Sequence, residues 1–194
     1  MAEVLSTFLL KQGAAAPDFT LTDADGVTCS LADVRGANGL LVVFACNHCP
    51  FVEHLADALG HFAEEALGQD VPTVAIMPND VSRYPADGPE EMREFAAAHG
   101  WSFPYLIDST QEVAKAYGAA CTPDFFLFDR DLHLFYTGQF DDTRPRSGVP
   151  HGGDMREALR KMLAGESTLE RPYPSSGCNI KWIPGSEPPW LEIE

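Results

Sequence analysis

A pair of cysteines stands where a strongly apolar run gives way to a helical pattern. The run covers residues 40–45 (LLVVFA), Cys46 and Cys49 follow it, and a helix is predicted to open at Pro50. A short continuous run of leucine and valine is typical of a parallel strand that is buried on both faces. Proline in the first helical turn loses no hydrogen bond. The chain is therefore predicted to form a β–α unit with two thiols at its connection.

This placement of the thiols favours redox chemistry. The thiolate is the reactive form of cysteine, and the N-terminus of a helix stabilises it through unpaired N–H groups and the helix dipole. We expect Cys49 to have the lower pKa and to attack, and Cys46 to resolve a mixed disulfide; the opposite assignment stays open. His48 between them would increase thiolate character when protonated. We expect one of the two sulfurs to be solvent-accessible.

Composition narrows the class of protein. With 194 residues, 45% of them apolar, the chain can form one domain with its own core. Five cysteines in such a chain favour redox or metal use over a disulfide framework, and the lack of a secretory leader predicts a cytoplasmic protein. The net charge is −16 and the 13 Lys and Arg residues form no cluster, so neither nucleic acid nor a membrane is expected as a partner.

Strand and helix patterns alternate along the rest of the chain. Strands are predicted near 19–22, 27–31, 71–77, 105–108, 125–128 and 132–136, and helices near 50–67, 89–99, 109–117 and 154–163, the second of them opening with the stretch Asp87-Gly88-Pro89-Glu90. This order predicts an α/β fold: a three-layer sandwich with a central mixed β-sheet, an N-terminal β-hairpin and helices on both faces. Residues 1–164 would form the domain, and the tail 165–194 is apolar enough to pack back on it.

These motifs together resemble the thioredoxin superfamily, and within it the peroxiredoxin-like branch of alkyl hydroperoxide reductases and thiol-specific antioxidants. The resemblance rests on three features: the strand–Cys–helix junction at 40–51, the Thr122-Pro123 pair before a strand, and the order of elements between them. A closer likeness is to bacterial thioredoxin-family proteins with a Cys-Asn-His-Cys-Pro-Phe-Val stretch (46–52), a Cys-Thr-Pro-Asp stretch (121–124) and a Gly-Cys-x-Ile-Lys-Trp tail (177–182).

The resemblance implies a second part of the site. Thioredoxins place a cis-proline opposite the active cysteine, so we expect the Thr122–Pro123 bond to be cis and the Thr122 backbone to pair with an extended substrate chain. Counted from Phe44, the thioredoxin and peroxiredoxin patterns both put the attacking cysteine at Cys49. The peroxiredoxin threonine then falls at Cys46, and its arginine at or near Pro123.

The remaining cysteines are assigned lesser roles. Cys121, beside the proline, and Cys178, in the tail, are candidate accessory thiols, with packing as the alternative for each. Cys29, in the predicted hairpin, is expected to be structural. Under the favoured interpretation we expect no organic cofactor and no resident metal.

The favoured function is a thiol–disulfide oxidoreductase that acts on a protein or small-molecule disulfide and is recycled by an external thiol reductant. A thiol peroxidase acting through a sulfenic acid at Cys49 is the first alternative, and the missing threonine and arginine count against it. The second is a non-enzymatic carrier of copper(I) or zinc with ligands from Cys46, Cys49 and either His48 or Cys121. The third is a redox-inactive interaction module.

Overall fold

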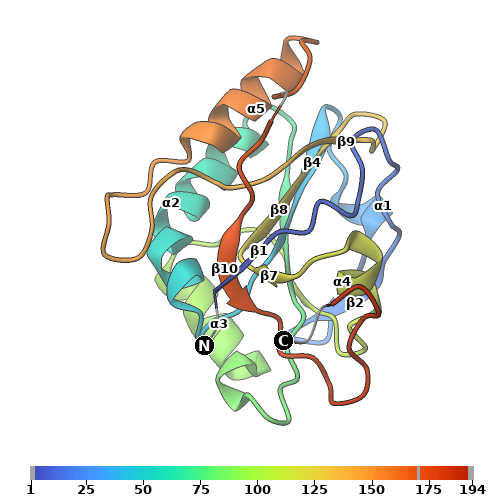
Figure 1. Cartoon of the computed structure of the whole chain (residues 1–194), viewed down its shortest axis with the longest axis vertical. Coiled ribbons are helices and arrows are strands. Elements are labelled where there is room, and N and C mark those ends of the chain that lie inside the picture. Colours follow the sequence, from blue (N-terminus) through green and yellow to red (C-terminus); the bar gives the residue numbers. More distant parts are fainter. Residues whose placement is uncertain (1–2, 170, 192–194) are drawn as a thin grey trace.

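A seven-stranded mixed sheet with helices on both faces forms the centre of the chain (Figure 1). This computed structural model describes residues 3–169 and 171–191. The strands are β1 (Glu3–Leu5), β2 (Thr20–Asp23), β3 (Thr28–Ser30), β4 (Gly39–Phe44), β5 (Thr73–Met77), β6 (Tyr105–Ile107), β7 (Cys121–Thr122), β8 (Asp124–Asp129), β9 (Leu134–Thr137) and β10 (Ser176–Asn179). The helices are α1 (Leu31–Val34), α2 (Pro50–Leu67), α3 (Pro89–Ala98), α4 (Glu112–Tyr117) and α5 (Gly153–Leu163), with a 3-10 turn η1 (Pro85–Asp87). The predicted fold class is confirmed.

Strand β4 lies inside the sheet, whose order is β3-β2-β6-β5-β4-β8-β9. It pairs in parallel with β5 and antiparallel with β8, and all six of its residues are buried. Its side chains alternate between two cores. Leu41 and Val43 pack with residues of α2, α3 and α5, whereas Leu40, Val42 and Phe44 pack with residues of α1 and α4. Burial on both faces explains why this stretch of sequence is apolar without alternation.

Helix α2 has the bounds that the sequence pattern predicts. Cys49 is its N-cap residue and Pro50 opens its first turn. The side chains of Val52, Leu55 and Leu59 recur at helical spacing and are buried against the sheet. The helix therefore fixes Cys49 at the carboxyl end of β4, one residue before its first turn.

The residues after α5 return to the domain and form a second, small sheet. Strand β10 lies between β1 and β7 and pairs antiparallel with both. Figure 1 shows β10 and β1 running side by side across the front of the molecule, next to the start of α2. Beyond β10, Ile180 and Trp182 are buried in the core that contains α4. In the described parts of the chain no helix is both long and apolar enough to span a bilayer.

Some short elements differ from the predicted ones. The elements β1, α1, β7, η1 and β10 do not appear among the predicted elements, because segments of two to four residues have no periodicity of their own. Helix α4 begins at Glu112 instead of near Ser109, since Gln111 has a left-handed φ of 65°. The Gln111 amide donates to the carbonyl oxygens of Pro78 (2.7 Å) and Lys181 (2.9 Å), which ties this helix start to the tail.

Candidate active site

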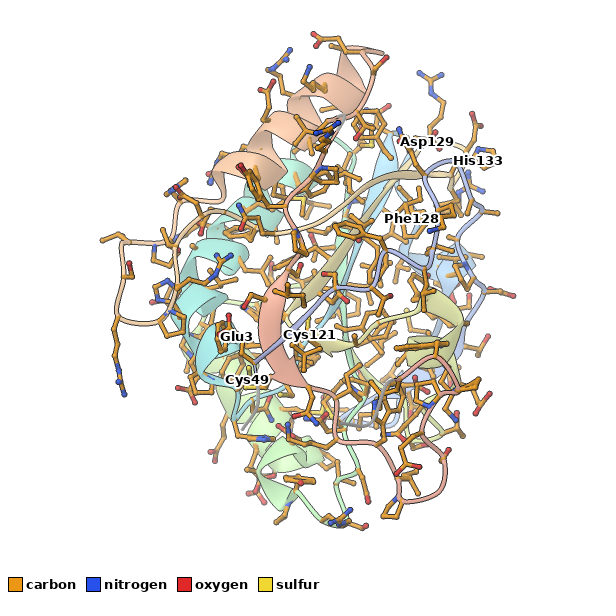
Figure 2. All side chains as sticks on the ribbon, in the orientation of Figure 1. Glu3, Cys49, Cys121, Phe128, Asp129 and His133 are labelled. Carbon is orange, nitrogen blue, oxygen red and sulfur yellow. The ribbon has the colours of Figure 1, made fainter. Side chains whose placement is uncertain are left out.

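Three cysteines meet beside Thr122 at the N-terminus of α2. As a thiol, Cys49 donates a hydrogen bond to the Thr122 carbonyl oxygen (3.0 Å), and Cys46 Sγ lies 3.2 Å from Thr122 Oγ1. Cys178 on β10 is directly opposite Thr122 in the strand register. All three sulfurs belong to one buried cluster. Figure 2 shows Cys49 next to β10. The structure thus brings together the predicted pair, Thr122 and one of the two candidate accessory thiols.

The three thiols differ in pKa because their surroundings differ. Hydrogen bonds from the Cys178 thiol and then from the Cys46 thiol lower the pKa of Cys49, with further help from the backbone N–H of Val52 in the first turn of α2, while burial opposes them. The pKa of Cys46 is raised because its proton is shared with Cys49, and burial and the Asp87 charge add to this effect. The pKa of Cys178 is raised by the same bond to Cys49 and by burial. Cys49 is therefore the sulfur that carries the negative charge.

The expectation that one sulfur of the pair is solvent-accessible is wrong. The exposed fraction is 1% for Cys46 and 0% for Cys49, and Cys178 is only 3% exposed. Strand β10 passes over the site and shields it from solvent, because it is fixed to β7 on one side and to β1 on the other. All five cysteines lie in the described ranges, and none forms a disulfide there.

The Thr122–Pro123 segment before β8 has the predicted cis bond, but β10 occupies the place expected for a substrate chain. The Thr122–Pro123 bond is cis, as expected. The expectation that the Thr122 backbone is open to an incoming chain is wrong, because β7 is already paired with β10 and Thr122 is fully buried. Pro123 lies against the neighbouring pocket, together with Phe51 of α2.

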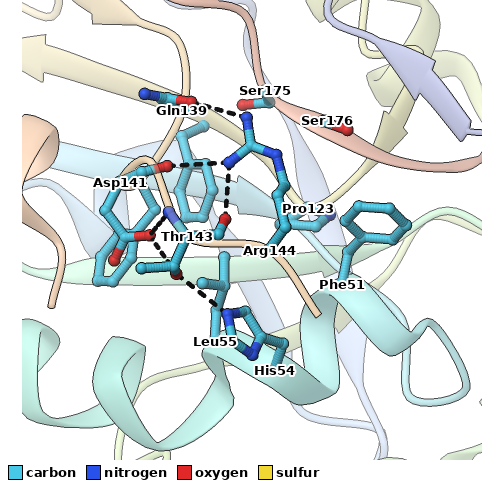
Figure 3. Close-up of a pocket in the computed structure, with 12 residues that line it drawn as sticks. Phe51, His54, Leu55, Pro123, Gln139, Asp141, Thr143, Arg144, Ser175 and Ser176 are labelled. Carbon is cyan, nitrogen blue, oxygen red and sulfur yellow. Dashed lines mark hydrogen bonds between the residues drawn. The ribbon is translucent and has the colours of Figure 1, made fainter. Parts of the chain in front are cut away.

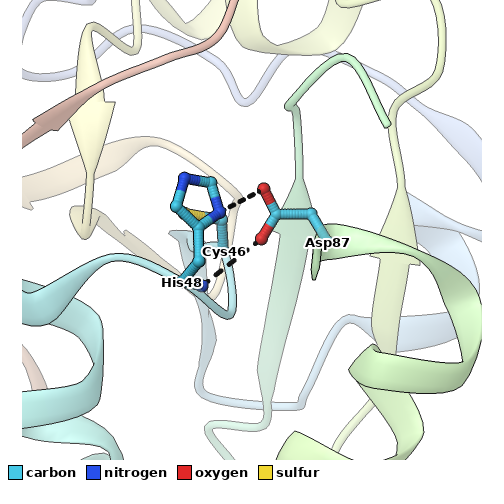
Figure 4. Close-up of side chains that lie close together, drawn as sticks. All are labelled: Cys46, His48 and Asp87. Carbon is cyan, nitrogen blue, oxygen red and sulfur yellow. Dashed lines mark hydrogen bonds and ion pairs between the residues drawn. The ribbon is translucent and has the colours of Figure 1, made fainter. Parts of the chain in front are cut away.

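His48 is held by the buried carboxylate of Asp87. The sequence pattern assigns Asp87 only to the start of a helix and not to the site. His48 Nδ1 lies 2.7 Å from Asp87 Oδ2 (Figure 4). The backbone N–H of Asn47 donates to Asp87 Oδ1 (2.9 Å). The amide of Asn79 donates to the other oxygen (2.8 Å), and the His48 ring stacks on Tyr84. A sequence signal for Asp87 exists only in hindsight: it follows β5, whose carboxyl end lies beside that of β4 because the two strands are parallel.

The cluster of Cys46, His48 and Asp87 also has the donor set of a zinc site. One ligand atom from each residue lies within 4.8 Å of the other two, and thiolate, imidazole and carboxylate are all zinc ligands. However, the two oxygens of Asp87 already accept hydrogen bonds from the Asn47 and His48 backbone and from the Asn79 amide, and one of them lies 2.7 Å from His48 Nδ1. A carboxylate occupied in this way orients the imidazole and leaves it beside the thiol of Cys46.

Removing the Asp87 carboxylate is expected to destabilise the fold strongly. Asp87→Ala removes the acceptor of the Asn47 and His48 backbone N–H groups and of the Asn79 amide, together with the ion-pair partner of the His48 ring, and the free energy of unfolding should fall by about 3 kcal/mol. Urea unfolding of the reduced protein measures this change. Asp25→Ala is the matched control, because Asp25 is 68% exposed and its ion pair with Arg93 is on the surface. Equal stability of the two variants would contradict the role of Asp87.

A small, half-open pocket lies against Pro123 (Figure 3). Phe51 and Leu55 of α2 form one wall, and Arg144, from the loop after β9, lies across it. The Arg144 guanidinium donates to Gln139 Oε1 (2.8 Å) and to backbone carbonyls of its own loop. An arginine therefore does lie near Pro123, as in the peroxiredoxin pattern, but its described hydrogen bonds hold the loop, and no cysteine lines the pocket.

The other two cysteines have different surroundings. Cys121 is fully buried, its thiol donates to the Pro123 carbonyl oxygen (3.5 Å), and burial raises its pKa. Neighbouring residues of a strand point to opposite faces, so Cys121 does not share the face on which Thr122 meets the pair. Cys29 lies in β3, at the edge of the central sheet.

Comparisons with known proteins agree with this arrangement. Residues 12–137 match the AhpC/TSA family. A candidate peroxiredoxin of Mycobacterium tuberculosis is 37% identical over 117 residues, which are 58% of this chain and 67% of that protein. The thiol-disulfide oxidoreductase ResA of Geobacillus thermodenitrificans is 29% identical over 119 residues, or 61% of this chain. The match spans only 64% of the length of that ResA.

Among solved structures, an uncharacterised conserved protein from Geobacillus kaustophilus is 47% identical, with a TM-score of 0.91 over 95% of this chain and 98% of its own. A hypothetical protein from Sinorhizobium meliloti is 45% identical, with a TM-score of 0.89 over 93% of this chain and 99% of its own. The peroxidoxin BcpB of Mycobacterium tuberculosis shares the fold at 19% identity, with a TM-score of 0.61 over 81% of this chain and 99% of its own.

Proposed function

Because this chain belongs to the AhpC/TSA family, we propose that it is a thiol–disulfide oxidoreductase in which Cys49 attacks and Cys46 resolves. One observation carries the assignment of roles: Cys49 is the N-cap residue of α2 and receives hydrogen bonds from two thiols, which lower its pKa. A sulfur that is ionised near neutral pH can attack without first losing a proton. Cys46, with a raised pKa, is the thiol that waits for the second step.

The reaction follows from this separation of charge. The Cys49 thiolate attacks one sulfur of a substrate disulfide, and the other substrate sulfur leaves as a thiolate. Cys46 then gives up its proton, for which His48 is the nearby acceptor, oriented by Asp87. The Cys46 thiolate attacks Cys49, a Cys46–Cys49 disulfide forms, and the second substrate thiolate departs. An external dithiol returns the pair to the reduced state.

A peroxide is the second candidate oxidant, because the family and the Mycobacterium tuberculosis relative favour it. Cys49 would attack the peroxide oxygen and become a sulfenic acid, and Cys46 would condense with it and release water. Both oxidants lead to the same disulfide. The comparison of second-order rate constants for hydrogen peroxide and for a small disulfide distinguishes between them.

A single-turnover experiment tests the proposal. Fully reduced protein mixed with one equivalent of 5,5′-dithiobis(2-nitrobenzoate) should release two equivalents of coloured thiolate and keep no aryl adduct. Peptide mapping should find Cys46 and Cys49 oxidised in the main product. One equivalent released, with the adduct spread over Cys29 and other cysteines, would contradict a dedicated pair.

Other features of the proposal come from the sequence and from the relatives. A protein or small-molecule disulfide is the proposed substrate, and a thiol reductant the proposed electron donor, as the name of the ResA relatives suggests. The division into a redoxin domain (1–164) and a tail (165–194) stays a prediction, as does the cytoplasmic location.

A further inference from the structure

Strand β10 occupies the place where an extended substrate chain would pair with β7. Cys178 and Asn179 face Thr122 and Cys121 in antiparallel register, and β1 covers the far edge of β10. An extended peptide recognised by main-chain hydrogen bonds adds to an open strand edge. The edge of β7 is closed here by the chain's own tail.

The contact between β10 and the proline loop is unusually close. A Cβ atom at Gly177 would lie 2.1 Å from the Thr122 carbonyl oxygen and 3.1 Å from the Pro123 nitrogen, so only glycine fits there. Cys49 Sγ lies 3.0 Å from the same Thr122 oxygen. Gly177 therefore lets β10 approach close enough for the next residue, Cys178, to share one buried cluster with Cys49.

We propose that β10 is a built-in substrate strand, and that Cys178 forms a disulfide with Cys49 during the reaction cycle. The strand register, the closeness of Gly177 to Thr122 and the burial of both sulfurs in one cluster carry this inference. It rests on the proposed role of Cys49 as the attacking thiol. It adds a third thiol to the reaction, and it makes β10 the occupant of the strand edge at which a substrate chain would pair with β7.

The exchange balances without any further reactant. Once Cys49 is joined to a substrate sulfur, the Cys178 thiol loses its proton to solvent and attacks the Cys49 sulfur. The Cys49–Cys178 bond forms, the bond to the substrate breaks, and the substrate sulfur leaves with the electron pair as a thiolate. Cys46 can then attack Cys49, which releases Cys178 as a thiolate and leaves the Cys46–Cys49 disulfide for the external dithiol.

The variant Cys46→Ser isolates this step, because it removes the competing resolving thiol. Reduced full-length variant is mixed with oxidised glutathione, quenched with acid, and mapped by mass spectrometry. We expect peptides linked through Cys49 and Cys178, together with one equivalent of reduced glutathione released beyond the first. In the double variant Cys46→Ser/Cys178→Ser, Cys49 should keep its glutathione. Cys46→Ser/Cys29→Ser is the matched control and should behave like Cys46→Ser.

The possible failures have separate readouts. A stable glutathione adduct on Cys49 in Cys46→Ser, with Cys178 still a thiol, would overturn the role of Cys178 and leave the proposed function intact. No reaction of Cys49 with glutathione, in this variant and in the wild type, would overturn both.

A second variant tests whether β10 occupies the edge of β7 as a built-in substrate strand. Gly177→Ala places a methyl group where the Thr122 carbonyl oxygen now lies, so β10 must shift away from β7. We expect alkylation of Cys49 and reduction of insulin by dithiothreitol both to become at least tenfold faster. Gly68→Ala is the matched control, because its methyl group would meet only ordinary contacts of 3.4 Å or more. Unchanged rates in a folded Gly177→Ala protein would contradict the proposal that β10 occupies the edge of β7.

Discussion

Replacing Cys49 by serine is expected to abolish turnover, with a loss of at least about 1,000-fold in the reduction of a small disulfide. A serine hydroxyl stays protonated at neutral pH and cannot take over the attack on sulfur. Cys46 cannot replace it efficiently, because the charge of Asp87 and the burial that raise its pKa remain in the variant. The measurement is the initial rate of oxidised glutathione reduction by dithiothreitol, corrected for the uncatalysed reaction.

A spectroscopic readout separates loss of chemistry from loss of structure. Thiolate absorbance near 240 nm should show one ionised thiol per chain at pH 6 in the wild type and in Cys29→Ser. It should be lost in Cys49→Ser while the circular dichroism spectrum is unchanged. If Cys49→Ser kept both the thiolate signal and the activity, and Cys46→Ser lost them, the roles of the two cysteines would be reversed.

The parts of the site that could be predicted are those encoded by local patterns. The run 40–45 is apolar because β4 is buried on both faces, and the helical spacing after Pro50 reports one buried face of α2. The local sequence alone therefore predicts that Cys46 and Cys49 lie at the connection between β4 and α2. The same holds for the sheet as a whole, since alternating strand and helix patterns leave few topologies.

What surrounds the pair could not be predicted, because it depends on pairing across long sequence separations. Ser176–Asn179 carries no alternating apolar pattern, and its strand conformation comes from its pairing with β1 and β7. Asp87 reaches His48 from a turn that only the folded loop brings back to the site. The thiols are buried beneath β10, so an expectation of accessibility that is based on the β–α junction alone fails.

A second large effect is expected from a carboxyl group that lies just beyond the cis-proline. Asp124, the first residue of β8, is fully buried. Its oxygens accept hydrogen bonds from Ser6 Oγ (2.9 Å) and from the Ala120 N–H (3.4 Å), but burial dominates and raises its pKa to about 7. In the unfolded chain the pKa of an aspartate is about 3.9. Folding therefore increases the affinity of this group for a proton.

The direction of the pH effect follows from these two values. Below about pH 4 the carboxyl group is protonated whether the chain is folded or unfolded, and its contribution to stability is complete. Between about pH 4 and pH 7 unfolding releases the proton, so the free energy of unfolding falls as the pH rises. Above about pH 7 the group is ionised in both states, and the whole contribution of about 4 kcal/mol has been lost.

The variant Asp124→Asn should remove this dependence, because an amide of nearly the same shape does not titrate. Relative to the wild type, its free energy of unfolding should increase by up to about 4 kcal/mol between pH 4 and pH 8, as measured by urea unfolding of the reduced protein. Asp25→Asn, at an exposed position, should follow the wild type across the same range. A constant difference between Asp124→Asn and the wild type at every pH would mean that Asp124 is already ionised in the folded protein. The hydrogen bonds from Ser6 and Ala120 would then outweigh its burial beside the thiol site.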